Sequence, residues 1–341
     1  MKSLPQIYIA FPTVEMPGGG GNQFLRLLKK EFQNRGVYTN AEEADFILFN
    51  SHQNVSKVIE LKQKYHNKIF IHRIDGPIRL YNNMDDHRDC LAYTTNRFIA
   101  HATVFQSEWS RQNNYCLGLN RNAFETVILN ASDTAYFYPI DKEANRKRIE
   151  EIQTAKRKIR IIATSWSSNI KKGFETYAYL DMHLDWNQYE MTFVGNSPIE
   201  FNNIKYVEPL TSKALGEALR EADVYISASQ KDPCSNSVIE ALNTRIPVIC
   251  LNDGGHPELV KDGGMLFENA DEIPNILEKV VLDYEEIQKR INVCPAKDIA
   301  DEYIRFAQEV QEQVELGKYI PKKIGAIKSL LLKARVRWWS R

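Results

Sequence analysis

Short apolar runs and longer amphipathic segments alternate along the chain. Runs of roughly four to eight apolar residues predict buried strands, whereas apolar residues that recur every three or four positions predict helices. Because helical segments separate the runs, we expect the strands to be parallel. In the first half the predicted strands are Ile7–Phe11, Asp45–Phe49, Lys68–His72, Thr103–Phe105 and Thr126–Leu129.

The same alternation restarts in the second half. Lys142–Arg157 is a charged helical stretch with few apolar residues, and this change of composition predicts a domain boundary. The strands predicted after it are Lys158–Ala163, Met191–Val194, Val224–Ile226 and Pro247–Leu251. We therefore predict two α/β domains, at residues 1–145 and 146–300, then a helix at 301–316 that packs back across the domains and a separate tail at 317–341.

The length, the composition and the cysteine content are those expected of two folded domains in a reducing compartment. The 341 residues exceed one typical α/β domain, and 43% hydrophobic residues supply enough material for two cores. The five cysteines are scattered and form no Cys-x-x-Cys pair, which is typical of a cytosolic protein. The N-terminus has no secretory pattern, and no uncharged run approaches the length of a membrane span. We expect a cytoplasmic protein.

Positive charge is concentrated in the tail. Residues 317–341 hold eight Lys or Arg and no Asp or Glu, and because the whole chain balances 44 basic against 44 acidic residues, the rest carries about −8. Nucleic-acid binding by the globular body is thereby disfavoured. A basic helix with an apolar stripe and terminal tryptophans is typical of an interfacial membrane anchor, to which each cation contributes on the order of 1 kcal/mol at an anionic leaflet. The alternative is a helix that is solvated or packed on protein. The stripe consists of Ile324, Ile327, Leu331, Ala334 and Trp338.

Polar residues follow several of the predicted strands. The first strand leads into a glycine loop, Pro17–Asn22, which is either a backbone cradle for a phosphate or sugar or a flexible turn. It is neither a dinucleotide fingerprint nor a P-loop.

His72, Arg73 and Asp75 end the third strand, where sheet ligands bind, although a histidine at a strand end is as often structural. Lys172 lies between a strand and a helix, where its ammonium either meets a diphosphate or is simply solvated.

The richest stretch runs from Ser227 to Phe267 and reads as strand, polar loop, helix, strand, glycine turn and helix. Loops at the carboxyl ends of neighbouring strands, each opening a helix, are where α/β sheets bind anionic ligands. Asp232 and Glu240 flank the start of the first helix. A nucleotide-sugar offers hydroxyls to carboxylates and phosphates to a helix N-terminus.

These motifs resemble those of a known enzyme family. Asp232, seven residues and Glu240-Ala-Leu, followed by Pro247-Val, Gly254-Gly255-His-Pro-Glu258 and Gly264, are similar to the sugar-nucleotide motif of retaining family 4 glycosyltransferases. Lys172-Gly173 resembles their phosphate-binding lysine, and Val127-Ile-Leu-Asn130-Ala-Ser-Asp133 their interdomain segment. The resemblance covers roughly residues 5–316. It implies a GT-B fold, with two Rossmann-like domains facing a central cleft, and here a basic amphipathic C-terminal helix follows.

The resemblance also implies roles for individual residues. Asp232 should hold hydroxyls of the transferred sugar, and Glu240 those of the ribose. His72 and Asp75 should line the sugar and acceptor pocket. No metal or cofactor is implied, because helix-start amides and a lysine stabilise the leaving diphosphate of a UDP- or GDP-sugar. The phosphates should meet Lys172 and the amides of Ser235, Asn236, Ser237 and Val238, with Gly19, Gly20 and Gly21 approaching the diphosphate or the acceptor.

Two positions depart from the family pattern. Asp232 stands where the family carries Glu, and Ser167 where it carries an arginine about five residues before the lysine. We expect a retaining hexosyltransferase that is peripheral on the inner face of the membrane and acts on a glycan, of a lipid-linked or surface polysaccharide such as O-antigen or capsule. The alternatives are a soluble transferase with a small-molecule acceptor, or a catalytically weak protein that binds a nucleotide-sugar or glycan. An epimerase shares the fold but fits the motif less well. The base, sugar, acceptor, linkage and oligomeric state are left open by the sequence.

Overall fold

The chain folds into two compact units that do not follow the predicted division. A computed structural model describes residues 4–12 and 20–339. Unit 1 comprises Met1–Asn130 and Ala296–Arg341, and unit 2 comprises Ala131–Pro295. The predicted boundary at 145/146 falls inside the second unit, because the charged helix α6 (Lys142–Gln153) packs there.

Unit 1 is built on a parallel sheet whose strands lie in chain order, β1-β2-β3-β4-β5. Every residue of β2 and β3 is buried, which explains why these strands are continuous apolar runs. Helices α1 (Gly20–Asn34), α2 (Val55–Lys64), α3 (Ile78–Tyr81), α4 (Arg88–Ile99) and α5 (Glu108–Cys116) connect the strands β1 (Ile7–Ile9), β2 (Phe46–Asn50), β3 (Ile69–Ile74), β4 (Ala102–Phe105) and β5 (Phe124–Val127).

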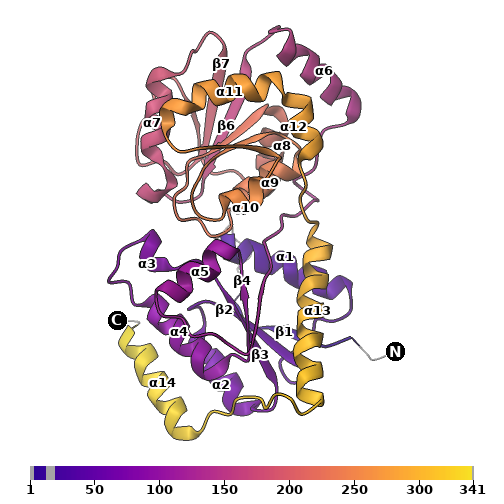
Figure 1. Cartoon of the computed structure of the whole chain (residues 1–341), viewed down its shortest axis with the longest axis vertical. Coiled ribbons are helices and arrows are strands. Elements are labelled where there is room, and N and C mark those ends of the chain that lie inside the picture. The colour runs from indigo at the N-terminus through magenta and orange to yellow at the C-terminus, as the bar shows by residue number, and fades with distance from the viewer. Residues whose placement is uncertain (1–3, 13–19, 340–341) are drawn as a thin grey trace. The chain divides into compact units, whose positions relative to one another are not determined.

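The C-terminal segment returns to unit 1 as two helices. Helix α13 (Ala296–Glu315) packs against α1, where the ring of Tyr303 lies 6.3 Å from that of Phe24. Helix α14 (Ala326–Trp339) packs against α2 and α4, beside which it lies in Figure 1. The predicted helix at 301–316 is therefore the larger part of α13, and the predicted tail contains α14.

Unit 2 holds the second parallel sheet, in the order β11-β10-β9-β6-β7-β8. Its strands are β6 (Ile159–Ser165), β7 (Tyr189–Gly195), β8 (Lys205–Val207), β9 (Val224–Ser227), β10 (Val248–Leu251) and β11 (Gly264–Phe267). In addition to α6, the helices are α7 (Phe174–His183), α8 (Ser212–Glu221), α9 (Asn236–Asn243), α10 (His256–Val260), α11 (Ile273–Leu282) and α12 (Tyr284–Arg290), with single turns η1 (Ile170–Lys172) and η2 (Ala270–Glu272). From β6 the chain adds β7 and β8 on one side of the sheet, and it then returns to add β9, β10 and β11 on the other side. The direction of strand addition therefore reverses between the adjacent strands β6 and β9.

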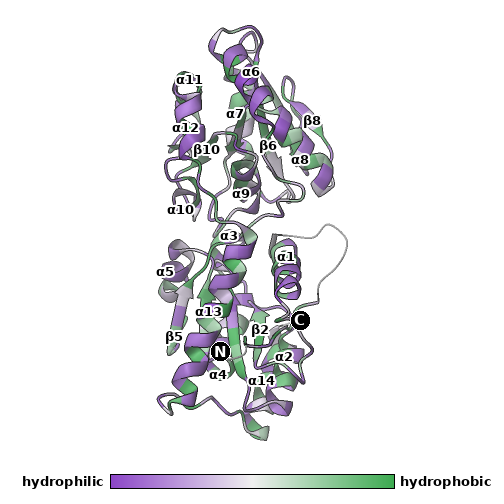
Figure 2. Ribbon diagram, turned by 90° about the vertical axis from the view of Figure 1, so that its right-hand side faces the viewer, coloured by the Kyte–Doolittle hydropathy of each residue, from purple (hydrophilic) through white to green (hydrophobic). Residues whose placement is uncertain are grey.

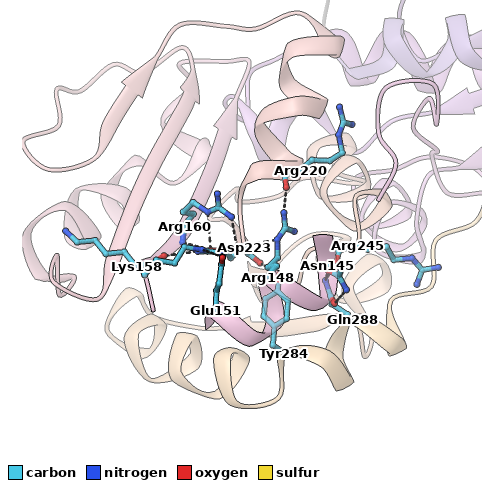
Figure 3. Close-up of polar contacts among 11 residues, drawn as sticks. Asn145, Arg148, Glu151, Lys158, Arg160, Arg220, Asp223, Arg245, Tyr284 and Gln288 are labelled. Atoms are coloured by element: carbon cyan, nitrogen blue, oxygen red, sulfur yellow. Dashed lines mark hydrogen bonds and ion pairs between the residues drawn. The ribbon is translucent and has the colours of Figure 1, made fainter. Parts of the chain in front are cut away.

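A buried carboxylate fixes α6 to this unit. Figure 3 shows Asp223, which precedes β9 and is fully buried, beside Arg148 of α6 and Arg160 of β6. Asp223 accepts hydrogen bonds from Arg157 Nη1 at 2.6 Å and from the Arg160 amide at 2.8 Å. Although burial raises the pKa of Asp223, Arg157 and Arg160 hold it below its usual value. Helix α6 is largely hydrophilic in Figure 2 but buries Arg148, whose Nε lies 3.6 Å from Asp223 Oδ1, so this ion pair contributes to its attachment.

The predicted class, two parallel α/β domains, is confirmed. Strand β5 begins two residues before the predicted Thr126, and β8 and β11 were not predicted. No helix in the described part of the chain is long and apolar enough to cross a bilayer.

Candidate functional site

In unit 2, three loops meet at the carboxyl ends of β6, β9 and β10. We call them the β6 loop (166–173), the β9 loop (228–235) and the β10 loop (252–255). Because the strand order reverses between β6 and β9, this edge has the topology at which parallel α/β sheets bind ligands.

The sequence-predicted pair Lys172 and Asp232 meets at this edge. Lys172 Nζ lies 3.1 Å from Asp232 Oδ2, and the two side chains are 20% and 13% exposed. Burial raises the pKa of the Asp232 carboxyl, but the Lys172 ammonium outweighs this effect and leaves the pKa below its ordinary value. Asp232 is therefore a carboxylate at neutral pH, and it holds a lysine that a phosphate could also bind.

Two glycines allow the loops to interlock. Gly173 has φ +79°, and a Cβ there would lie 2.1 Å from the Ala228 carbonyl oxygen. Gly254 has φ +65°, and its Cβ would lie 2.3 Å from the Asp232 carbonyl oxygen. An L side chain at either position would be strained and would also collide with backbone. These glycines hold the β6 and β10 loops against the β9 loop.

Asp253 adds a polar clamp between the β9 and β10 loops. Its carboxylate accepts from the Lys231 amide at 3.0 Å and from Lys231 Nζ at 2.9 Å. The Gly255 amide in turn donates to the Asp232 carbonyl at 2.8 Å. The backbone that carries Asp232 is thus fixed from both sides. The sequence interpretation missed this role of Asp253 and Lys231, for which the only signal was their position in two neighbouring loops.

Helix α9 begins directly after the β9 loop. Its N-cap Ser235 makes no side-chain cap; its Oγ lies 3.1 Å from Ser237 Oγ instead. The predicted phosphate-binding amides, those of Ser235 to Val238, lie where the β9 loop ends and α9 begins. The backbone N–H groups and the helix dipole at this position favour an anion.

Glu240 lies one turn further along α9 and is 5% exposed. Burial raises the pKa of its carboxyl to about 8. The carboxyl is consequently neutral at pH 7 in the unliganded protein.

His256 begins α10 behind the two glycines of the β10 loop, and its role was not predicted. Its imidazole is fully buried, and Nδ1 lies 2.9 Å from the Leu251 carbonyl, to which it donates. Nε2 has no hydrogen-bond partner within the described chain. Burial lowers the pKa of His256, and Asp232 partly opposes this shift. The histidine is a neutral group that anchors the end of β10.

In unit 1, a second polar network joins the carboxyl ends of four adjacent strands. At its centre is Arg73 of β3, whose side chain is fully buried. It donates to Asp75 Oδ1 at 2.8 Å and to Asn130 Oδ1 at 2.7 Å, and its guanidinium stacks 4.8 Å from the ring of Phe24. The other members are Asn50 at the end of β2, which bonds both Arg73 and Asp75, and Gln106 after β4, which donates to Asp75. Of the predicted pair His72 and Asp75, only Asp75 belongs to this network, and its side chain is 27% exposed.

His72 has a different environment from the one expected. It is fully buried and stacks on Phe49 with ring centroids 4.2 Å apart. Nε2 donates to the Ser51 carbonyl at 2.9 Å, and Nδ1 accepts from Asn96 at 3.1 Å. Burial lowers the pKa of His72 to about 3, so the ring is neutral. It positions the end of β2 from within the core.

The predicted glycine loop is described only in part. Gly19 lies outside the described residues, whereas Gly20 and Gly21 form the first turn of α1. A Cβ on Gly21 would lie 3.9 Å from the side-chain nitrogen Nδ2 of Asn50, so this turn borders the unit 1 network. No group of three or more His, Cys, Asp or Glu that could hold a metal ion occurs within residues 4–12 and 20–339.

Comparisons with known proteins show a family match in one segment of the chain and solved structures of similar fold. Residues 201–292, which include the β9 and β10 loops, match the family described as Glycosyl transferases group 1. A protein of Klebsiella pneumoniae, described as an uncharacterized 41.2 kDa protein in cps region, is 25% identical over 182 residues. The match spans 50% of this chain and 49% of that protein, so about half the length of the curated relative is covered.

Two solved structures are similar over nearly the whole chain. Sucrose-phosphate synthase from Thermosynechococcus elongatus has a TM-score of 0.65 at 13% identity, over 92% of this chain and 99% of that one. Anabaena Alr3699/HepE, in complex with UDP and glucose, has a TM-score of 0.65 at 16% identity, over 92% and 100%. The two parallel-sheet units therefore have the GT-B fold, and residues 201–292 match the group 1 glycosyl transferase family.

Proposed function

We propose that this protein is a retaining, family 4-like hexosyltransferase that moves a sugar from a UDP- or GDP-sugar to a glycan acceptor. The observation that carries the proposal is the Lys172–Asp232 pair beside the start of α9, at the point where the strand order reverses. In this proposal the diphosphate binds between that cation and the backbone amides at the start of α9, beside the Asp232 carboxylate, which would accept from sugar hydroxyls. The UDP-glucose complex of Anabaena HepE, which has the same fold, supports a nucleotide-sugar donor.

In the proposed reaction the C1–O bond to the diphosphate breaks as the C1–O bond to the acceptor forms on the same face. Negative charge develops on the leaving phosphate, where Lys172 and the amides of Ser235–Val238 stabilise it. Lys172 must turn from Asp232 toward the phosphate, which frees the Asp232 carboxylate to accept from sugar hydroxyls. Because both ring nitrogens of His72 are engaged, we assign the acceptor proton to the leaving phosphate.

We further infer that the acceptor is a lipid-linked or cell-surface glycan and that the protein works at the inner face of a membrane. The name of the Klebsiella relative places it in a cps region, which supports a role in polysaccharide synthesis. The basic segment 317–341 supports attraction to anionic lipid.

The test is sugar transfer from a panel of UDP- and GDP-sugars, with lipid-linked and small soluble acceptors. We expect turnover with one donor, and a loss of at least about a hundredfold in Lys172→Ala and Asp232→Ala, the size seen when one transition-state contact is removed. Lys213→Ala and Asp271→Ala, both exposed in unit 2, are the matched controls. Donor binding without transfer or hydrolysis would instead support the binding-protein alternative, and turnover on small acceptors alone the soluble transferase.

A further inference from the structure

Helix α14 has two apolar faces, of which unit 1 covers only one. On the inner face Ser329, Leu332 and Val336 are buried, and Leu332 and Val336 join the core cluster that contains Val58 and Ile59 of α2. Lys333 Nζ reaches Gln63 of α2 at 3.2 Å. The C-terminal helix is therefore part of the fold of unit 1 and not a free tail.

The outer face carries the stripe seen in the sequence except Ile324, which precedes α14 and packs against the unit 1 core. Ile327 is 78% exposed, Leu331 60% and Trp338 75%, and Ala334 between them is also exposed. Leu330, at 70%, lies beside this stripe. Positions 327, 331, 334 and 338 follow helical spacing, so they share one side of α14. Four of the exposed large hydrophobic side chains in the described chain thus lie on this one helix, an apolar patch that calls for an explanation.

Charge indicates what covers this patch. At about 100° per residue, Lys328 and Arg335 fall along one border of the outer stripe and Arg337 along the other. No acidic residue occurs from Gly317 to Arg341. An apolar stripe bordered by cations, with a tryptophan in it, suits the interface of an anionic bilayer, where the stripe enters the headgroup region and the cations meet lipid phosphates.

We propose that α14 binds an anionic membrane through Ile327, Leu330, Leu331 and Trp338 while its inner face stays packed on α2 and α4. The proposal rests on the membrane association proposed above and changes its form: the anchor is a surface of unit 1, not a released tail. Such an anchor holds unit 1 itself against the lipid, because no flexible linker separates the helix from the core.

The test uses the full chain and phosphatidylcholine vesicles with and without phosphatidylglycerol. We expect binding only to the anionic vesicles, and weaker binding as salt is raised. Ile327→Ser/Leu331→Ser should weaken binding by at least about tenfold and leave the melting temperature unchanged, because both side chains are already exposed. Leu282→Ser, which removes a side chain that is 77% exposed in unit 2, should bind as wild type.

Hydrogen exchange on the vesicle-bound protein then separates a docked helix from a released one. Protection of the α2 and α4 amides should be unchanged on binding. If these amides lose protection, the helix leaves unit 1 to bind lipid, and the docked form is wrong although membrane association holds. Absence of vesicle binding, or a dimer that the double variant abolishes, overturns the membrane surface altogether. Sugar transfer to a soluble acceptor, measured without vesicles, tests the transferase separately.

Discussion

Donor binding should be linked to proton release through Glu240. The carboxyl is 5% exposed, and burial alone raises its pKa to about 8. If ribose hydroxyls donate to it in the complex, the ionised form is favoured, because hydrogen bonds to a carboxylate are the stronger ones. Binding below pH 8 must then expel the proton that the free protein carries.

The magnitude follows from the pKa. A carboxyl that titrates at about 8 is about 90% protonated at pH 7, so each donor bound there should release nearly one proton. Affinity should rise about tenfold per pH unit below 8, which gives about 50-fold, or about 2.3 kcal/mol, between pH 6 and pH 8. A nucleotide diphosphate sugar suits the measurement, since both of its phosphates are esterified and bind no proton in this range.

Isothermal titration in buffers of different ionisation enthalpy measures both quantities. Glu240→Gln keeps the shape of the protonated carboxyl but cannot ionise, so it should bind donor without proton release and with a flat pH dependence. Glu217→Gln, an exposed substitution in α8 of unit 2, is the matched control. A change in wild-type affinity of less than about threefold over this range, or a Glu240→Gln variant with the wild-type slope, would show that Glu240 is not the group that releases the proton.

Three further predictions concern the scaffold. Gly173→Ala should lower the stability of unit 2 by about 1–3 kcal/mol and abolish donor binding in calorimetry, whereas Gly36→Ala, at φ +64° with no atom within 4 Å of its Cβ, should bind normally. Asp223→Asn should cost about 3–5 kcal/mol in urea unfolding by removing the buried charge with which Arg157 and Arg160 pair, whereas the exposed Glu150→Gln should leave the unfolding midpoint almost unchanged; equal losses would contradict this. Burial, and then the charge of Lys322, lower the pKa of Lys62 to about 7. Above pH 7 the folded protein therefore binds fewer protons at Lys62 than the unfolded chain does. The free energy of unfolding should consequently rise by about 1.4 kcal/mol per pH unit from pH 7 toward pH 10. Lys62→Met should lose this rise in urea unfolding at pH 7 and 9; an equal rise in both proteins would contradict it.

The neutral state of Lys62 is also required by its hydrogen bonds. His101 Nδ1 accepts from the Phe70 amide at 2.7 Å, so a neutral ring carries its hydrogen on Nε2. That hydrogen points at Lys62 Nζ, 3.2 Å away, which can accept only as an uncharged amine. The geometry and the lowered pKa therefore agree on the protonation state that sets the sign of the pH dependence.

The sequence predicted those parts of the fold that depend on local pattern. β2 and β3 were found because every residue is buried. The edge strand β8 was missed because it is mostly exposed and forms no apolar run. Helix α6 was interpreted as a boundary because it is charged, yet Arg148 and Ile152 are buried in it. Its attachment depends on Asp223, some seventy positions away, which local pattern cannot reveal.

Prediction of the candidate site had the same limit. The loop positions of Lys172 and Asp232 were visible because strand ends and helix starts mark the edge of a parallel sheet. The burial of His72 was not, because a histidine at a strand end can face either the core or the solvent. Its stacking on Phe49 and its bond to Asn96 depend on neighbouring elements. The part of α14 that packs on α2 was likewise hidden, because both faces of the helix are apolar and only the outer stripe had been recognised.

The two departures from the family pattern become connected in the structure. With serine at 167, Lys172 is the cation of the β6 loop placed toward Asp232, and in the free protein it is bonded to that carboxylate. The shorter Asp still reaches the lysine, since Gly254 and Gly255 fix the backbone that carries it. In the proposed reaction one ammonium therefore serves two anions in turn, the carboxylate before the donor binds and the phosphate afterwards. Removing the Asp232 charge should then impair sugar positioning and also abolish the ion pair with Lys172, so Asp232→Asn should alter donor affinity as well as turnover.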